Sequence, residues 1–409
     1  MKKDKLTNFF EKFIQKESFF QNKKILQGNF IPDEIKHRDK QIELIAEILA
    51  PLLKKDLPSN IFVYGKTGTG KTVTIKYVCN KISEISKEQK IPLEIIYLNC
   101  KLKKIADTEY RLIAQLARLF GKAIPSTGLP TEEVYQIFFD ALEKSKKTVL
   151  LILDEIDQIV KKTGDELLYN LLRINYELKN SQIAIIGISN NIGFSNELDP
   201  RVKSSLNEEE VVFSPYNAIQ IQDILKERAK LAFKENILEE GVIAKCAAYA
   251  AREHGDARRA IELLRVSGEI AERKNQKTVK IENIDDAEEK VEKDRFLDLI
   301  KNQPKQFQII LYSIFIINEK KKGEIYTGEL YNLYKEISSK LGFRPLTQRR
   351  VSDIIVELDM LGIINGKVTS KGRYGRTREI SLSTPSTLDL KIKAILEEDL
   401  DLGSKNEFF

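Results

Sequence analysis

The octapeptide GKTGTGKT at residues 65–72 limits most strongly what this chain can fold into. It fits the pattern G-x-x-x-x-G-K-[ST], and it lies between a short apolar run, IFVY, and a segment with helical apolar spacing. Glycines at these positions permit positive φ angles and let backbone N–H groups curve around a polyphosphate. The N-terminus of the helix that follows directs its dipole at the same anion. The motif therefore predicts a strand, a phosphate-binding loop and a helix in succession.

Each residue type in this loop has a chemical role. We expect Lys71 to reach the β- and γ-phosphates of a nucleotide, and the hydroxyl of Thr72 to bind Mg²⁺. The alternative is a chance glycine turn, which the strand before the loop and the helix after it argue against. The predicted nucleotide contacts are Gly65, Lys66, Thr67, Gly68, Thr69, Gly70, Lys71 and Thr72.

Short apolar runs without polar alternation recur in the first half of the chain, as expected of strands that are buried on both faces. They lie at 61–64, 93–99, 149–153, 183–188 and 211–213. Helical patterns separate them, beginning with a helix expected to start at Asp33. This alternation predicts an α/β fold with a parallel sheet and helices on both faces. After Pro215 the strands stop, and three helices are expected to form a small helical domain, at about 218–232, 239–253 and 256–272.

Polar side chains follow two of the predicted strands, where a doubly wound sheet binds its ligands. Asp154 is placed to hold Mg²⁺ through water, and Glu155 to polarise the water that attacks a γ-phosphate. Asn190 is placed to hydrogen-bond that water or the phosphate. In the helical domain, Arg258 lies one turn into a helix and is expected to lean over the phosphates, with Arg259 as the second choice. The alternatives are a solvated acidic turn, a simple Asn turn and a pair of exposed cations.

The composition excludes several classes of protein. Hydrophobic residues make up 42% and charged residues 31%, which is typical of a soluble globular chain. The apolar stretch at 309–317 is too short for a membrane helix, and the charged N-terminus is unlike a secretory signal. Three separated cysteines and two histidines give neither a disulfide scaffold nor a zinc site. We therefore expect a cytoplasmic protein with no membrane partner, associated with the nucleoid if it binds DNA.

Positive charge is concentrated near the C-terminus. Residues 340–379 hold nine Lys and Arg against four Asp and Glu, an excess of five in a chain whose net charge is +6. A helix is expected there, and its first turn is suited to the major groove of DNA. A Gly- and Arg-rich hairpin tip follows, which suits phosphates or a narrow minor groove. The alternative is a protein–protein contact. The predicted DNA contacts are Gln348, Arg349, Arg350 and Ser352 on the helix, and Arg373, Tyr374 and Arg376 at the hairpin.

The motifs GKTGTGKT, LILDEID, GISN and GDARRA, in that order, resemble those of the AAA+ ATPases. Three longer segments, IPDEIKHRDKQIELIAEILAPLL, ELDPRVKSSLNEEEVVFSPYNA and AAREHGDARRAIELLRVSGEIAER, resemble the archaeal origin-recognition and Cdc-six-type replication initiators. The C-terminal segments TQRRVSDIIVELDMLGII and GRYGRTREI are similar to the winged helix of that family. The resemblance extends from about residue 25 to 385.

This resemblance implies an AAA+ domain, a helical lid and a C-terminal winged helix, with ATP or ADP and Mg²⁺ as ligands. It implies that Arg38 lies in an adenine-contacting segment and that Tyr216 contacts the nucleotide. Arg201 is similar to the arginine finger that serves a neighbouring subunit; its alternative is an exposed Arg at a helix start. The extra residues at about 100–148 resemble an initiator-specific insertion of two helices that touches DNA through Thr127 and Gly128; the alternative is a surface hairpin.

The family suggests an ATP-dependent initiator that binds duplex DNA at replication origins and helps to recruit or load the replicative helicase, with slow hydrolysis as a switch. Related initiator paralogues are possible partners. An alternative is a paralogue that represses initiation or regulates transcription, and a third is a clamp-loader-like ATPase, which normally lacks a basic winged helix. The predicted domains are an arm at 1–20, the ATPase domain at 21–215, the lid at 216–290, the winged helix at 291–390 and a tail at 391–409.

Overall fold

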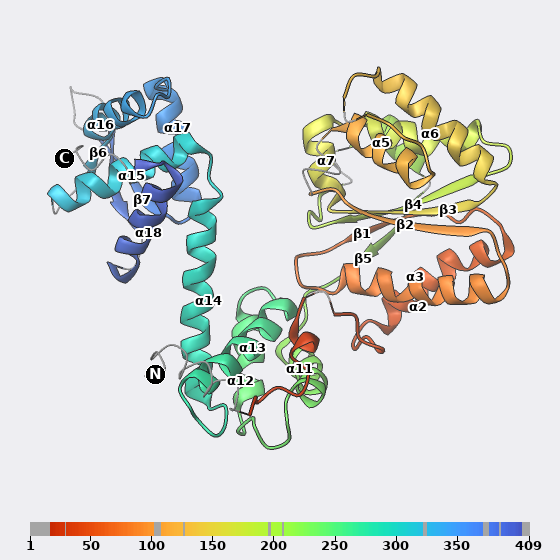
Figure 1. Cartoon of the computed structure of the whole chain (residues 1–409), viewed down its shortest axis with the longest axis horizontal. Coiled ribbons are helices and arrows are strands. Elements are labelled where there is room, and N and C mark those ends of the chain that lie inside the picture. Colours follow the sequence, from red (N-terminus) through yellow and green to blue (C-terminus); the bar gives the residue numbers. More distant parts are fainter. Residues whose placement is uncertain are drawn as a thin grey trace, which may run out of the picture. The chain divides into compact units, whose positions relative to one another are not determined.

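The computed structural model describes residues 17–28, 30–101, 108–125, 127–194, 198–206, 208–321, 325–370, 376–383 and 386–402. The chain divides into two compact units, Met1–Ala287 and Glu288–Phe409. Figure 1 shows the elements of each unit, and each is described by itself. No helix in these ranges combines the length and the apolar character that crossing a bilayer requires.

A five-stranded sheet forms the centre of the first unit (Figure 1). Its strands run in the order β2-β3-β4-β1-β5, and every neighbouring pair is parallel. Because the inner strands β3 and β4 are covered on both faces, nearly all of their residues are buried. This confirms the predicted α/β class. The strands are β1 (Asn60–Tyr64), β2 (Leu93–Asn99), β3 (Thr148–Asp154), β4 (Gln182–Ser189) and β5 (Glu208–Val212).

Alternate residues of each strand pack against helices on opposite faces of the sheet. In β1, Ile61 and Val63 share a core with helices α2 (Asp39–Leu49) and α3 (Lys71–Glu88). Phe62 and Tyr64 join the other core, which includes residues of α5, α6, α7 and α8. Figure 1 shows these two helical layers on either side of the sheet. The second layer comprises α5 (Glu109–Leu119), α6 (Thr131–Ser145), α7 (Ile156–Thr163) and α8 (Glu166–Arg173).

The helix expected from Asp33 starts six residues later, at Asp39, so that prediction was wrong. His37 has a left-handed φ of 60°, which interrupts any helix that begins before it. The side chain of Arg38 is buried beneath the phosphate loop instead of lying on a helix surface. Residues 30–38 therefore form an irregular segment that crosses the site described below.

Three helices, α11 (Ala218–Ala232), α12 (Val242–Arg252) and α13 (Ala257–Arg273), form the helical lid of the first unit. The described N-terminal residues pack on this lid, because the rings of Phe20 and Phe233 lie 4.7 Å apart and Gln21 N–H donates to the carbonyl of Ala232. The 3-10 helix η1 (Lys23–Leu26) continues the contact. Residues 17–28 thus belong with the lid, which corrects the expected boundary at residue 20 between a free arm and the ATPase domain.

The second unit is built on the end of α14 (Ile281–Lys301), a helix that begins in the first unit. A three-stranded sheet of order β6-β8-β7 packs with its helices around one apolar core. Helix α18 contributes Leu388, Ile392 and Leu396 to that core, so the segment expected as a tail from residue 391 is a packed helix as far as Asp399. The remaining elements are α15 (Lys305–Lys320), β6 (Ile325–Tyr326), α16 (Thr327–Lys340), α17 (Gln348–Met360), β7 (Ile364–Ser370), β8 (Arg376–Leu382) and α18 (Ser386–Asp399).

Candidate functional site

The phosphate loop joins β1 to α3 and places Lys71 in a buried position with 5% of its surface exposed. Its ammonium donates to the carbonyls of Gly65 and Lys66 at 2.6 and 2.7 Å and to Asn190 Oδ1 at 2.9 Å. Burial and, as a smaller contribution, nearby Arg258 together lower the pKa of Lys71 to about 8, against the opposing effect of acidic neighbours such as Asp154. A cation that costs this much to bury is suited to a strongly anionic ligand.

The hydroxyl of Thr72 and the carboxylate of Asp154 meet beside this lysine. Thr72 Oγ1 donates to Asp154 Oδ2 at 3.0 Å, and the hydroxyl of Tyr97 donates to the same oxygen at 2.6 Å. The other oxygen, Asp154 Oδ1, accepts the backbone N–H of Glu155 at 3.0 Å. Burial next to Asp154 raises the pKa of Tyr97. Hydroxyl and carboxylate oxygens are the ligands that Mg²⁺ prefers, so this donor set fits that ion.

Glu155 follows Asp154 in a left-handed conformation, with φ 56° and ψ 43°. This turn between β3 and α7 leaves the glutamate half-buried, with its Oε2 3.7 Å from the ammonium of Lys101. Asn190 at the end of β4 is exposed and reaches Lys71. The parallel sheet therefore brings Lys71, Thr72, Asp154 and Asn190 together, although they lie far apart in the sequence.

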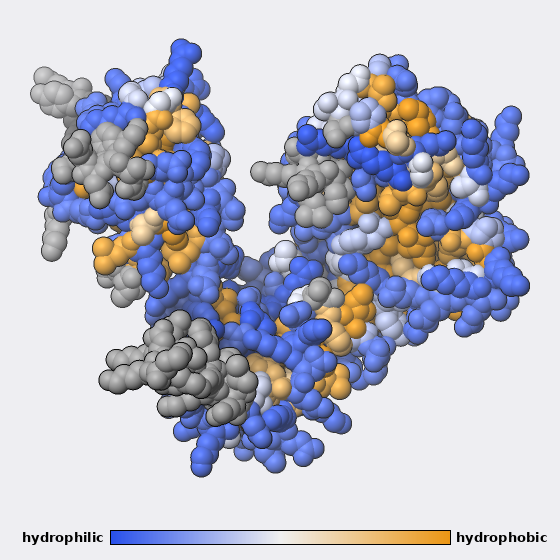
Figure 2. Space-filling view, in the orientation of Figure 1, coloured by the Kyte–Doolittle hydropathy of each residue, from blue (hydrophilic) through white to orange (hydrophobic). Residues whose placement is uncertain are grey.

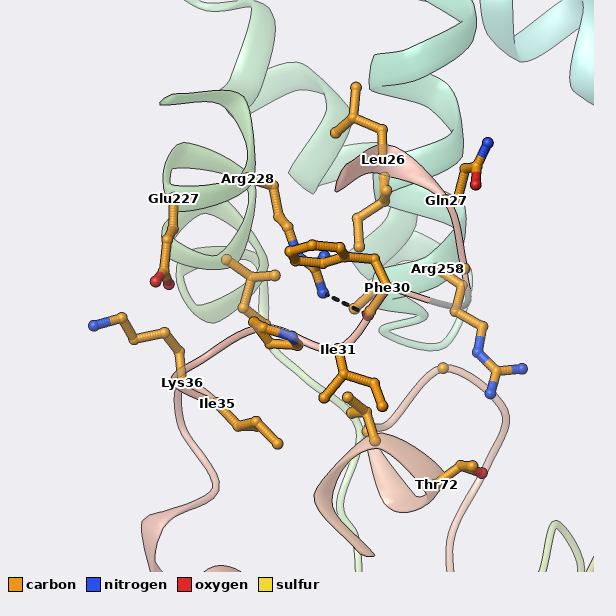
Figure 3. A pocket seen from close by; sticks show the side chains of 18 of the residues that line it. Leu26, Gln27, Phe30, Ile31, Ile35, Lys36, Thr72, Glu227, Arg228 and Arg258 are labelled. Atoms are coloured by element: carbon orange, nitrogen blue, oxygen red, sulfur yellow. Dashed lines mark hydrogen bonds between the residues drawn. The ribbon is translucent and has the colours of Figure 1, made fainter. Parts of the chain in front are cut away.

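A pocket of about 440 Å³ opens beside the loop, between the sheet domain and the lid. Gly68, Gly70 and Thr72 line one end of it, and Arg258 lies on the same side as Thr72 (Figure 3). The other end is largely apolar. The residues there, which the motifs did not single out, include Leu26, Phe30, Ile31, Pro32, Ile35, Ile224 and Ile261.

Arg228 of the lid fixes the segment that covers this apolar end. Its guanidinium donates to the carbonyls of Ile25 and Phe30 at 3.0 and 3.4 Å, and it lies 4.5 Å from the centre of the Phe30 ring. Figure 3 shows the bond to Phe30 as a dashed line. Burial lowers the pKa of Arg228. The resemblance implied an adenine-contacting segment around Arg38, but no sequence pattern singled out Ile25 or Phe30.

The lid touches the phosphate loop directly through the N-terminus of α13. Asp256 caps that helix by accepting the N–H groups of Arg258 and Arg259, and the N–H of Ala257 donates to the carbonyl of Gly68 at 3.2 Å. A Cβ on Gly68 would lie 1.8 Å from Asp256 Oδ1 and 2.8 Å from its Cα, so this contact requires glycine. The two arginines differ: Arg258 is exposed on the pocket, whereas Arg259 is buried and its Nε lies 2.8 Å from a carboxylate oxygen of Glu253, the C-cap residue of α12.

Arg38 lies beneath the loop and is absent from the residues that line the pocket. It donates from Nε to the carbonyl of Thr69 at 3.0 Å and from Nη2 to that of Ser214 at 2.7 Å. Its guanidinium carbon lies 3.8 Å from the centre of the Tyr216 ring, and burial lowers the pKa of Arg38 and raises that of Tyr216. Tyr216 also lines the pocket, and its hydroxyl would be 2.6 Å from a Cβ on Gly70. Arg38 thus stabilises the phosphate loop on the side away from the pocket, through its bond to the carbonyl of Thr69.

The structure does not bring Arg201, Thr127 and Gly128 to this pocket. Arg201 lies in α10 (Pro200–Leu206) with 82% of its side chain exposed, and its Nε is 3.1 Å from Asp199 Oδ1. Thr127 and Gly128 are exposed in the loop between α5 and α6. Ser126 in the same loop lies outside the described residues.

In the second unit, α17 presents an exposed polar turn. Gln348, Arg349 and Arg350 are exposed, and Arg350 Nη1 lies 3.1 Å from Glu357 Oε1. Ser352 is half-buried and donates to the carbonyl of Gln348 at 3.0 Å. Of the hairpin residues, Arg373 and Tyr374 lie outside the described residues, and Arg376 begins β8. Hydrophilic residues cover much of the visible surface of both units (Figure 2).

Comparisons with known proteins cover most of this chain. An AAA domain model matches residues 55–191, a Cdc6 AAA+ ATPase-type lid domain matches 222–289, and a CDC6 C-terminal winged helix domain matches 298–391. The ORC1-type DNA replication protein of Pyrococcus abyssi is 51% identical over 98% of this chain and 97% of its own, and that of Pyrococcus furiosus is 49% identical over 97% and 94%. The solved structure of the Aeropyrum pernix ORC1 protein in complex with DNA is 40% identical, with a TM-score of 0.84, over 95% of this chain and 99% of that one.

Proposed function

The chain belongs to the ORC1-type DNA replication proteins, an AAA+ ATPase family, and from this premise we propose that it is a nucleotide-controlled initiator. It binds ATP at the phosphate loop, binds duplex DNA at replication origins, and helps to recruit the replicative helicase. The observation that carries the nucleotide part is the buried ammonium of Lys71, which three oxygen atoms surround next to Thr72 and Asp154. Phosphate oxygens are better acceptors for that cation than the two carbonyls and the amide it contacts.

The two ends of the pocket bind different parts of ATP or ADP. The triphosphate lies along Gly65–Thr72, and the adenine lies among the apolar residues around Phe30 and Ile31, with Tyr216 beside the loop. Thr72 and Asp154 would hold Mg²⁺, which neutralises charge on the phosphates. Arg38 keeps the loop in its curved form by bonding to the carbonyl of Thr69.

Glu155 acts as the general base that takes the proton from the attacking water, and Asn190 orients that water or the γ-phosphate. Arg258 faces the phosphates from the lid, so the negative charge near its guanidinium decreases when ATP is hydrolysed to ADP. Because the lid rests on Gly68 through Asp256 and Ala257, that change is transmitted to the position of the lid. Hydrolysis is slow and serves as a switch. Arg201 is exposed and serves the nucleotide of a neighbouring subunit when subunits stack.

DNA is bound by the exposed first turn of α17, by the hairpin with Arg373 and Arg376, and by the insertion loop with Thr127 and Gly128. The 40% identical Aeropyrum pernix relative, which was solved in complex with DNA, supports this proposal. Contacts from arginine to phosphate supply most of the affinity, so binding weakens steeply with salt.

Footprinting of the purified protein on the candidate origins of its own genome, with ATP, with ADP and without nucleotide, tests the proposal. We expect protection of a defined duplex site that responds to the nucleotide. Protection of no site at low salt would contradict it. A pull-down of the replicative helicase then separates an initiator, which retains the helicase, from a paralogue that represses initiation or regulates transcription, which leaves it behind.

A further inference from the structure

We propose that Tyr97 is a positioning residue for the metal side of the nucleotide site. Its hydroxyl holds the carboxylate of Asp154 in the orientation that lets this carboxylate and Thr72 bind one divalent cation. The inference rests on the proposed function, because it concerns the cation that accompanies the nucleotide. No motif in the sequence pointed to Tyr97, which lies about three residues before the region of the predicted insertion.

Three hydrogen-bond donors surround the carboxylate of Asp154. Oδ1 accepts the N–H of Glu155 at 3.0 Å, and Oδ2 accepts Thr72 Oγ1 at 3.0 Å and the Tyr97 hydroxyl at 2.6 Å. The Thr72 hydroxyl must turn a lone pair toward a cation when one binds. Tyr97 then remains as the side-chain donor to Oδ2 and fixes the rotation of the carboxylate.

The position of Tyr97 in the sheet explains how it reaches this carboxylate. It lies on the edge strand β2, opposite Ile152 of β3, so Asp154 is two residues further along the neighbouring strand and points to the same face. Tyr97 is 36% exposed, and its hydroxyl reaches Asp154 Oδ2.

A second contact holds the ring itself. The ammonium of Lys76 lies 4.0 Å from the centre of the Tyr97 ring, a short cation–π distance. Lys76 follows Thr72 by four residues in α3, so both side chains project from the same face of the helix. Lys76 also lines the nucleotide pocket. One face of α3 therefore supplies both the predicted metal ligand Thr72 and Lys76, the cation that orients the ring of Tyr97.

Hydrogen bonds to metal-ligating carboxylates commonly account for about 10- to 100-fold in metal affinity. We expect Tyr97→Phe to weaken binding of Mn²⁺, used as a spectroscopic substitute for Mg²⁺, by about tenfold. Free Mn²⁺ is measured by electron paramagnetic resonance during titration into protein loaded with ADP. The affinity for ADP in EDTA should not change, because the hydroxyl donates to Asp154, which is not among the residues that line the pocket.

Hydrolysis gives an independent test. In Tyr97→Phe, the Mg²⁺ concentration for half-maximal ATP hydrolysis should rise about tenfold, while the rate at saturating Mg²⁺ stays within about twofold of the wild type. Tyr77→Phe is the matched control. Tyr77 is half-buried on α3, the helix that carries Thr72 and Lys76, and it packs against the core between α3 and the sheet. Lys76→Met should weaken Mn²⁺ binding less, by about two- to fivefold.

The outcomes separate this inference from the proposed function. If the wild-type protein fails to bind ADP, the proposed function is wrong. If it binds ADP and Tyr97→Phe has the same Mn²⁺ affinity as the wild type, the positioning role alone is refuted. A Tyr97→Phe protein that loses ADP affinity in EDTA, or whose melting temperature falls well below that of Tyr77→Phe, would show that Tyr97 supports the sheet edge generally, and this too would overturn the inference.

Discussion

The phosphate loop and the first turn of α17 are both rich in basic and polar residues, but they are built in opposite ways. Lys71 is buried and bonded to three oxygen atoms that come from two strand–helix connections. Arg349 and Arg350 are exposed, and the contact of Arg350 with Glu357 lies within the same helix. A buried cation has a high desolvation cost and demands a matching anion, whereas exposed cations are free to adapt to a ligand. The first region therefore specifies its ligand through its fold, and the second mainly through its charge.

The largest expected effect is at the chemical step of the buried site. Glu155→Gln keeps the size of the side chain but removes the general base, so ATP hydrolysis should fall by about a thousandfold while ATP binding is retained. Phosphate release in single turnovers measures the first quantity, and equilibrium binding of ATP the second. Glu133→Gln, an exposed position on α6, is the control. Unchanged turnover in Glu155→Gln would remove this residue from its assigned role.

A substitution at the contact between loop and lid tests whether the buried site depends on its fold. Gly68→Ala places a Cβ against Asp256 and strains a φ of +71°, at a combined cost of about 3 kcal/mol to the closed lid. Nucleotide affinity, measured by calorimetry, should therefore fall about a hundredfold.

Gly121→Ala provides a matched control for this experiment. Gly121 has a similar φ of +78° but no atom within 4 Å of its added Cβ, so the substitution introduces the backbone strain without the collision. Its nucleotide affinity should equal that of the wild type. Equal losses in the two variants would mean that the contact between Gly68 and Asp256 does not control binding.

The lowered pKa of Lys71 predicts that both the stability of the protein and its nucleotide affinity depend on pH. Between pH 8 and the ordinary pKa of lysine, the folded protein binds fewer protons than the unfolded chain, so the stability of the nucleotide-free protein rises with pH in this window. The affinity for nucleotide falls as pH rises, because the phosphates bind the charged ammonium of Lys71 more strongly than its neutral form. Affinity for ADP in EDTA should be about tenfold weaker at pH 9 than at pH 7, with uptake of a proton at the higher pH. A flat profile would show that Lys71 remains charged throughout.

The smallest effect is expected at a single exposed cation of α17. Arg349→Ala should flatten the dependence of log affinity for DNA on log salt by about one, as expected for one lost phosphate contact. Arg350→Ala should flatten it by less, because Arg350 must leave Glu357 before it reaches DNA. Arg373→Ala combined with Arg376→Ala should flatten the slope by about two at most.

Salt titrations of DNA binding measure these slopes, with Lys81→Ala and Lys87→Ala on α3 as controls of equal charge change. If the controls flatten the slope as much as Arg349→Ala, the effect is due to net charge and α17 is not the DNA contact.

The contrast between the two regions also explains what could be predicted from the sequence. The fold class, the phosphate loop and the strand ends at Asp154 and Asn190 were accessible because each is a local pattern with a fixed place in a parallel sheet. The comparisons confirm the fold class and the family.

Long-range contacts made by ordinary residue types could not be predicted from the sequence. Phe30 and Ile31 are common apolar residues, and only the contacts of Phe19–Asn22, Ile25 and Phe30 with the lid make them the wall of a pocket. The bond from Tyr97 to Asp154 depends on strand pairing. The helix predicted from Asp33 failed because the burial of Arg38 against Tyr216 outweighs local helical spacing, and α18 looked like a tail because its apolar residues find their partners far back in the chain.

The most direct test of the central claim is a titration of labelled ATP into the wild-type protein and into Lys71→Ala, with Lys87→Ala as the control. We predict one nucleotide per chain in the wild type and the control, and no binding at micromolar nucleotide in Lys71→Ala. Retention of micromolar affinity in Lys71→Ala would contradict the assignment of the buried phosphate site and the nucleotide control that depends on it.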